Sequence, residues 1–121
     1  MYGHRRPVGT AADRGAVTVE AALALCSLAM FLAVAVACVV AVTASIRCID
    51  AARELARLAA RGEPERGRAV AAALAPESAR VVLTEDGDLV VAEVSVELVR
   101  PLPLRVGGRA VAAREPGAVT A

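Results

Sequence analysis

The feature that most limits how this chain can fold is an uncharged stretch of 26 residues, from Ala21 to Ile46. About 20 apolar helical residues cross the hydrocarbon core of a bilayer, so this stretch is long enough to span a membrane. A cleaved secretory signal has a shorter apolar region of about 7–15 residues. A lipoprotein signal ending at Cys38 is a weaker alternative, because the apolar stretch continues beyond that residue. The sequence therefore predicts one membrane-spanning helix.

The helical pattern continues beyond the apolar stretch. Between Ile46 and Arg61, apolar residues recur at intervals of three and four, with charged residues between them. No Gly or Pro lies between Ala16 and Arg61, whereas Gly62 and Pro64 follow at once and form a typical helix stop signal. We therefore expect one helix over residues 16–61, whose membrane part is about 21–46.

The segment after this helix predicts a small cap. Hydrophobic residues make up 57% of the chain, yet it has one Phe, one Tyr and no Trp. Ala and Val therefore carry most of the hydrophobicity, and any soluble core should be thin. Residues 66–74 are rich in Ala and predict a short helix that ends before Pro76. Two β-prone runs then flank Asp86-Gly87, which is a favoured two-residue hairpin turn.

The hairpin register can be predicted from the side chains. If Glu85 pairs with Asp88, Leu83 lies opposite Val90 on an apolar face. On the other face, the same register pairs Arg80 with Glu93, which carry opposite charges.

The last part of the chain predicts a third strand. Pro101 and Pro103 should end the second strand or leave it at an edge. After Gly107-Gly108, residues 109–113 can form a third strand, and residues 116–121 are expected to be a flexible tail.

The predicted fold class is α+β: a long N-terminal transmembrane and extended helix, then a cap with a short helix and a two- to three-stranded antiparallel sheet. The expected segments are a leader (1–15), the long helix (16–61), the α/β cap (62–115) and the tail (116–121).

An acidic residue at the start of the apolar stretch is the main functional signal. Glu20 is the only acid between Asp13 and Asp50, and it directly precedes the uncharged run. A carboxylate at a membrane boundary is costly and marks a functional position by default. It lies five positions after Gly15, which follows a short segment containing Arg5, Arg6 and Arg14. An ordinary interfacial Glu is the simpler alternative reading.

The segment Gly15-Ala16-Val17-Thr18-Val19-Glu20, after a short basic leader, resembles the processing site of TadE-family (TadE/TadF-like) minor pilins of tight-adherence, Flp-type IVb pili. The resemblance covers about residues 10–61, and beyond them it extends only to the architecture. Unlike many members of that family, the chain has Ala21 after the Glu and lacks a Pro in the apolar run.

The resemblance implies cleavage after Gly15 by a prepilin peptidase. The new ammonium of Ala16 would then be neutralised by Glu20 of a neighbouring subunit during assembly. The implied partners are the prepilin peptidase, other pilin and minor pilin subunits, the inner-membrane pilus assembly platform and membrane lipid. The implied location is the cytoplasmic membrane, single-pass, with the N-terminus in the cytoplasm, the cap outside, and incorporation into the pilus.

Other residues carry weaker signals. Cys26 and Cys38 lie in the apolar run and are most simply small apolar residues. Cys48 lies just beyond it, where it can be a free thiol or form an intermolecular disulfide. His4 has no ligand partners in the sequence and the three cysteines lack the spacing of metal ligands, so we expect no metal. No Gly-rich phosphate loop follows a strand and no nucleophile elbow occurs, so we expect no cofactor, no catalytic residues and no enzyme activity. The net charge of +1 gives no footprint for nucleic acid.

Two functional classes remain open from the sequence. The first is a minor pilin or pseudopilin subunit of a tight-adherence type IV pilus assembly or secretion system. The second is a single-pass membrane protein whose small external cap anchors or contacts another membrane complex. Basic residues flank both ends of the apolar run, so the positive-inside rule does not fix the orientation of the helix in the membrane.

Overall fold

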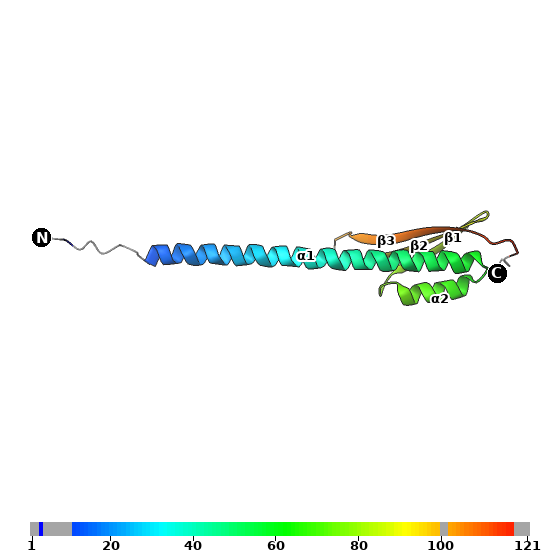
Figure 1. The fold of residues 1–121 in the computed structure, drawn as a ribbon, viewed down its shortest axis with the longest axis horizontal. Helices are drawn as coiled ribbons and strands as arrows, with labels where there is room; N and C mark the ends of the chain where they lie inside the picture. The colour runs from blue at the N-terminus through cyan, green and yellow to red at the C-terminus, as the bar shows by residue number, and fades with distance from the viewer. Residues whose placement is uncertain (1–2, 4–10, 100–101, 118–121) are drawn as a thin grey trace. The chain divides into compact units, whose positions relative to one another are not determined.

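A computed structural model describes residue 3 and residues 11–99 and 102–117. It confirms the predicted α+β fold, a long helix followed by a short helix and a three-stranded antiparallel sheet (Figure 1). The elements are α1 (Ala11–Ala60), α2 (Pro64–Leu74), β1 (Arg80–Asp86), β2 (Leu89–Glu97) and β3 (Arg105–Ala113).

Helix α1 is continuous and begins earlier than predicted. It starts at Ala11, so the expected boundary between leader and mature chain lies inside the helix. At its other end the backbone N–H of Glu63 donates to the carbonyl oxygen of Leu58 at 3.0 Å, and Gly62 adopts a φ of +85°. This left-handed glycine ends the helix as the sequence predicted.

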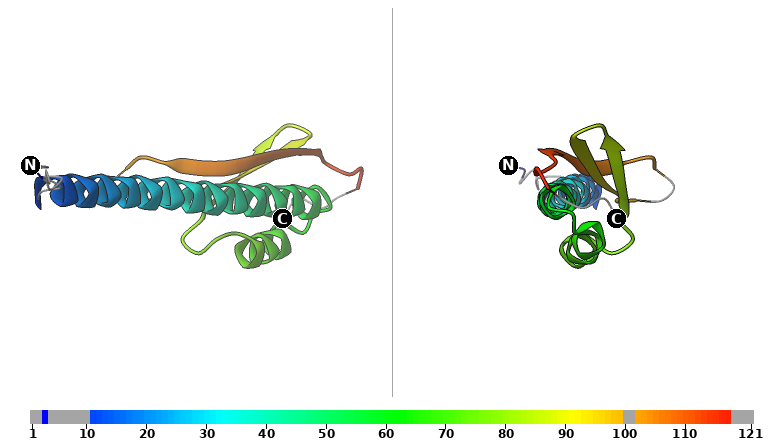
Figure 2. Two further views of the ribbon diagram at one scale, coloured as in Figure 1. Left: turned by 60° about the vertical axis from the view of Figure 1, so that its left-hand side comes forward. Right: turned by 90° about the vertical axis from the view of Figure 1, so that its right-hand side faces the viewer.

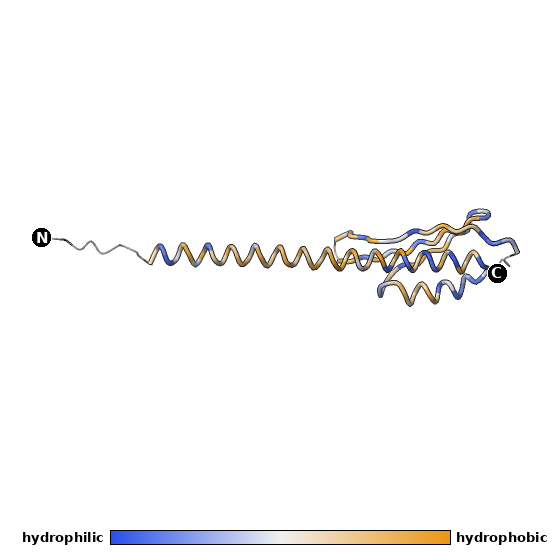
Figure 3. Tube along the Cα trace, viewed as in Figure 1, coloured by the Kyte–Doolittle hydropathy of each residue, from blue (hydrophilic) through white to orange (hydrophobic). Residues whose placement is uncertain are grey.

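The described chain divides into two compact units, residues 1–37 and 38–121. The described helical part of the first unit is the beginning of α1, and its side chains are exposed. The second unit contains the remainder of α1 together with α2 and the sheet. Coloured by hydropathy, α1 is mostly apolar until polar residues begin to alternate along its last turns (Figure 3).

Helix α2 packs closely against α1 through a glycine. It begins at Pro64, two residues before the predicted start, because Pro is well suited to the first position of a helix. A Cβ atom on Gly67 would lie 3.0 Å from Cδ1 of Leu55 and 3.3 Å from Cβ of Leu58. The absence of a side chain at Gly67 thus sets the distance between the two helices.

The sheet has the order β1-β2-β3, and both pairs are antiparallel. The predicted hairpin is present, but its predicted register is wrong by two residues. Leu83 pairs with Ala92, and Arg80 pairs with Ser95. The predicted pairing of Arg80 with Glu93 is therefore absent. Because the shift is even, the same side chains still point to the same faces.

The turn chemistry explains the shifted register. The two loop residues are Gly87 and Asp88, since Asp86 pairs with Leu89. Gly87 has a φ of +60°, as the first loop position of a type II′ turn requires. The predicted Asp86-Gly87 turn would have placed Asp86 in a left-handed conformation. That conformation is less favourable for aspartate than for glycine, which has no Cβ atom.

Strand β3 begins four residues before the predicted start, so the expectation that Gly107-Gly108 precedes the strand is wrong. Both glycines lie within β3, opposite Ser95 and Val94 respectively. A Cβ atom on Gly108 would lie 2.5 Å from the Cα atom of Ile49. The glycine is there because the backbones of β3 and α1 touch. The predicted end of β2 before Pro103 is confirmed, whereas Pro101 lies outside the described residues.

The core of the second unit is thin and built from small residues. The sheet lies on one side of the later part of α1 and α2 on another, as the views in Figure 2 show. Arg47 fixes the end of α2, because its guanidinium donates to the carbonyl oxygens of Leu74 and Ala75 at 3.1 and 3.2 Å. The buried residues of the core cluster are Ala44, Cys48, Ala51, Ala52, Leu55, Ala56, Ala71, Ala75, Ala92, Val94 and Val96.

The segment after β3 returns to the end of α1. The backbone N–H of Glu115 donates to the carbonyl oxygen of Ala60 at 3.0 Å, and its carboxylate lies 3.3 Å from Nε of Arg61. Arg114 pairs with Glu85 in the hairpin at 2.9 Å. The expected tail begins after this attachment, and its residues 118–121 lie outside the described part.

Candidate functional site

The predicted processing site lies in the first turns of α1. Gly15 is helical and exposed, and a Cβ atom there would meet nothing within 4 Å. The hydroxyl of Thr18 donates to the carbonyl oxygen of Arg14 at 2.8 Å, which spans the Gly15–Ala16 bond. A helical glycine is destabilising by roughly 0.5–1 kcal/mol relative to alanine, so this turn is a weak part of the helix. The leader residues His4, Arg5 and Arg6 lie outside the described residues.

Glu20 is exposed and lies one helical turn beyond Ala16. Both side chains therefore project from the same face of α1. An ammonium group created at Ala16 would lie one helical turn from the Glu20 carboxylate of its own chain. The structure thus places the two predicted assembly residues on one surface.

The apolar part of α1 is exposed from Ala21 to Val40. It is long and apolar enough to cross a membrane, and no part of its most apolar window is buried in the chain. A single long apolar helix near the N-terminus is compatible with a membrane anchor. Cys26 and Cys38 lie on this surface. The large exposed side chains include Leu23, Leu25, Leu28, Met30, Phe31, Leu32, Val34, Val36, Val39, Val40, Val42 and Ile46.

Cys48 lies in the core rather than on the surface. Its side chain is fully buried, and burial raises the pKa of the thiol while the charge of Arg47 lowers it to a smaller extent. A buried neutral thiol is a poor nucleophile. Of the two alternatives for Cys48, the intermolecular disulfide therefore conflicts with the fold, because the sulfur cannot reach a neighbour without opening of the cap.

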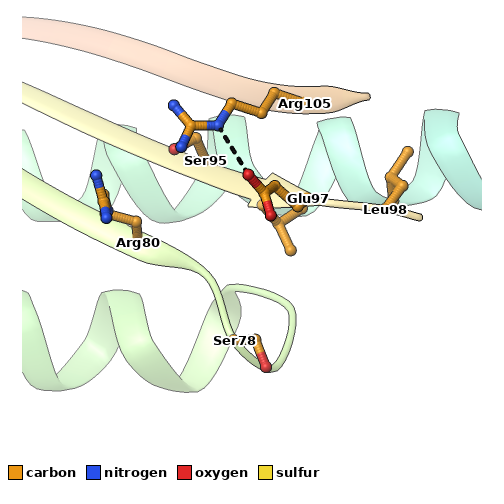
Figure 4. Close-up of a pocket in the computed structure, with 7 residues that line it drawn as sticks. Ser78, Arg80, Ser95, Glu97, Leu98 and Arg105 are labelled. Carbon is orange, nitrogen blue, oxygen red and sulfur yellow. Dashed lines mark ion pairs between the residues drawn. The ribbon is translucent and has the colours of Figure 1, made fainter. Parts of the chain in front are cut away.

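A hollow with a volume of about 590 Å³ lies on the sheet (Figure 4). In it, Nε of Arg105 lies 3.5 Å from the Glu97 carboxylate, and both side chains are about half exposed. Such exposed pairs contribute little to stability. Ser78 and Ser95 supply hydroxyls, but the sole His of the chain lies outside the described part. The lining residues are Ser78, Arg80, Ser95, Val96, Glu97, Leu98 and Arg105.

Among the described residues, no group of three or more His, Cys, Asp or Glu side chains is placed to hold a metal ion. Sequence reasoning missed another feature, the apolar surface of the loop between β2 and β3. Val99, Leu102 and Leu104 are all about half exposed. The signal was present in the alternation of Leu and Pro over residues 101–104.

Comparison with known proteins places the chain in a family. No family model matches the sequence, and no solved structure matches it significantly. The chain is 44% identical to apoptosis inhibitor Rv3655c of Mycobacterium tuberculosis over 102 residues, which cover 84% of this chain and 82% of that protein. The long helix and the α+β cap described above therefore belong to a member of the same protein family as this mycobacterial protein.

Proposed function

We propose that this protein is a minor pilin or pseudopilin subunit of a tight-adherence type IV pilus assembly or secretion system, related to the TadE family. The observation that carries the proposal is the position of Glu20, five residues after Gly15 and directly before 26 uncharged residues. The unbroken helix that connects this motif to a small cap supports it. In this proposal the leader faces the cytoplasm and the cap lies outside the membrane.

Processing begins at Gly15. A prepilin peptidase cleaves the peptide bond between Gly15 and Ala16, and water adds across it to give a carboxylate and an ammonium group. The bond lies within α1, so the first turns must unwind to enter a protease cleft in an extended conformation. The low helix propensity of Gly15 favours that opening. Glu20 acts afterwards, as a partner for the ammonium of Ala16 in assembly.

N-terminal sequencing of the protein purified from membranes tests this proposal. We expect the mature chain to begin at Ala16, and the variant Gly15→Val to remain a precursor that is heavier by about 1.5 kDa, at roughly 0.1 kDa for each of the 15 leader residues. A branched side chain hinders the close approach that glycine allows. Val19→Ile is a control that leaves the Gly–Ala bond unchanged. A wild-type chain that begins at Met1 or Tyr2 would favour the membrane-anchor alternative.

A second candidate function comes from the name of the relative, which is an apoptosis inhibitor. At 44% identity the same activity is a reasonable proposal for this chain. Cultured animal cells that express the chain should show a smaller apoptotic fraction after treatment with an inducer than cells expressing an unrelated single-pass protein of similar length. Equal apoptotic fractions in the two cultures would argue against this function.

A further inference from the structure

The loop between β2 and β3 leaves apolar side chains uncovered at one end of the cap. Val99, Leu102 and Leu104 are 48%, 57% and 52% exposed. The two ends of this loop lie close together, since the backbone N–H of Leu98 donates to the carbonyl oxygen of Leu104 at 3.0 Å. A cluster of large apolar side chains beside charged neighbours is typical of a surface that contacts a partner or a membrane.

The fold shows which part of α1 this loop accompanies. Strand β3 follows α1 in the same direction, because Gly108 touches Ile49 and Glu115 bonds to Ala60. From Gly108 back to Leu104 the strand covers about 13 Å at 3.3 Å per residue. At a rise of about 1.5 Å per helical residue, this distance corresponds to about six to nine residues of α1 before Ile49. The number is smaller when the angle between β3 and α1 is larger.

The loop therefore lies beside α1 at the level of about residues 40–43. Burial along α1 agrees with this position. Ala44 is buried and Ala41 partly buried, whereas Val40 and Val42 are exposed. Val96, just before the loop, belongs to the same buried cluster as Ala44. Figures 1 and 2 show β3 running alongside α1.

The same level is where a membrane-spanning helix would leave the hydrocarbon core. If Glu20 marks one boundary, a core about 30 Å thick is crossed by about 20 residues, which ends near Val40. The remaining apolar residues up to Ile46 then lie in the headgroup layer of the opposite leaflet. The loop side chains fall at this boundary.

We propose that Val99, Leu102 and Leu104, at the two ends of the β2–β3 connection, insert into the interface of the membrane that α1 spans. The loop forms a second apolar contact beside the helix and sets the height of the cap above the bilayer. Arg105 directly follows the loop, so its aliphatic stem can lie along the apolar surface while its charge stays among the lipid headgroups. The inference rests on the membrane-anchor part of the proposed function and is independent of cleavage at Gly15.

The absence of Trp in the chain permits a direct test. Single-Trp variants of the full-length protein are reconstituted into phosphatidylcholine–phosphatidylglycerol vesicles that contain lipids brominated either near the headgroup or near the methyl end of the acyl chain. Leu102→Trp reports the loop. Leu89→Trp is the matched control, because Leu89 is also an exposed apolar residue but lies at the opposite end of the sheet. Val34→Trp reports the middle of the apolar run.

Leu102→Trp should emit at shorter wavelength than Leu89→Trp. Because interfacial side chains lie about 5–10 Å into the headgroup–acyl boundary, we expect at least about twofold quenching by the shallow bromines and less by the deep ones. Leu89→Trp should be unaffected by either lipid. Equal behaviour of the Leu102 and Leu89 variants, or a blue shift at position 102 without lipid quenching, would overturn the inference. Failure of deep bromines to quench Val34→Trp would instead refute the membrane anchor itself.

Discussion

Replacement of Gly108 by alanine should open the cap. The added Cβ atom would lie 2.5 Å from the Cα atom and 2.6 Å from the backbone nitrogen of Ile49, and neither backbone atom can move aside as the end of a flexible side chain could. The sheet must therefore move away from α1. Overpacking of a core usually lowers the free energy of unfolding by 1–3 kcal/mol and occasionally by more. Because the added atom meets helix backbone, we expect Gly108→Ala to destabilise the closed cap by about 3 kcal/mol.

A loss of this size is large for the cap because its core contains few large side chains. The fully buried side chains of greatest volume are Leu55, Val90, Val94 and Cys48. Small domains have a low free energy of unfolding, so the cap should be open in a large part of the variant molecules. Opening would also detach the inner face of β2, which carries Val90 and Val94.

The thiol of Cys48 provides the measurement. In a background with Cys26→Ala and Cys38→Ala, the full chain in detergent micelles carries one cysteine, which is buried. A thiol reagent should label Cys48 about a hundredfold faster or more in Gly108→Ala, since 1.4 kcal/mol corresponds to about a factor of ten. Gly15→Ala is the control, because its Cβ atom meets nothing within 4 Å. Equal labelling rates in the Gly108 variant and the control would show that β3 does not touch α1 in this way.

Gly108 also illustrates what the sequence could not predict. Two adjacent glycines favour a break in a strand when only local preference is considered. Their actual role depends on the contact between β3 and α1, in which Gly108 meets Ile49 from 59 positions earlier in the chain (108 − 49). No local pattern contains that contact, so the sequence correctly predicted a third strand but placed its start too late.

The hairpin shows a similar division between local and longer-range information. The alternation of apolar residues predicted both strands and both faces correctly, because the side-chain period of two survives a shift by two residues. The alternation could not distinguish between two registers that differ by two residues, because both place the same side chains on the same face. That choice was made at the turn, where Gly87 rather than Asp86 takes the left-handed conformation.

The long helix was the most predictable element. Its apolar length, the lack of internal Gly or Pro after Ala16, and the stop at Gly62 all depend on local sequence. Its extension back to Ala11 was missed because Gly15 was interpreted as an extended protease substrate. The Gly15–Glu20 motif itself could be found from sequence, whereas the burial of Cys48 and the level of the β2–β3 loop depend on packing against α1.

Replacement of Glu20 by alanine should separate cleavage from assembly. Glu20 is five positions beyond Gly15, and the peptide bond to be cut does not include it. Its carboxylate becomes important once the ammonium of Ala16 exists, because an uncompensated charge in apolar surroundings is costly. We expect Glu20→Ala to be cut after Gly15, at least in part, but to be lost from pili.

Sheared pili and membranes from the same cells provide the comparison, with the amount of mature chain measured in each fraction. The ratio of pilus to membrane protein should fall at least about tenfold for Glu20→Ala and Glu20→Gln, since both remove the charge that offsets the ammonium. Glu20→Asp keeps the charge on a shorter side chain and should retain more assembly than Glu20→Gln. If the Ala variant is processed and assembled like the wild type, Glu20 is an ordinary interfacial residue. The physical basis for proposing a pilin would then be lost, because the ammonium of Ala16 would need no partner from this position.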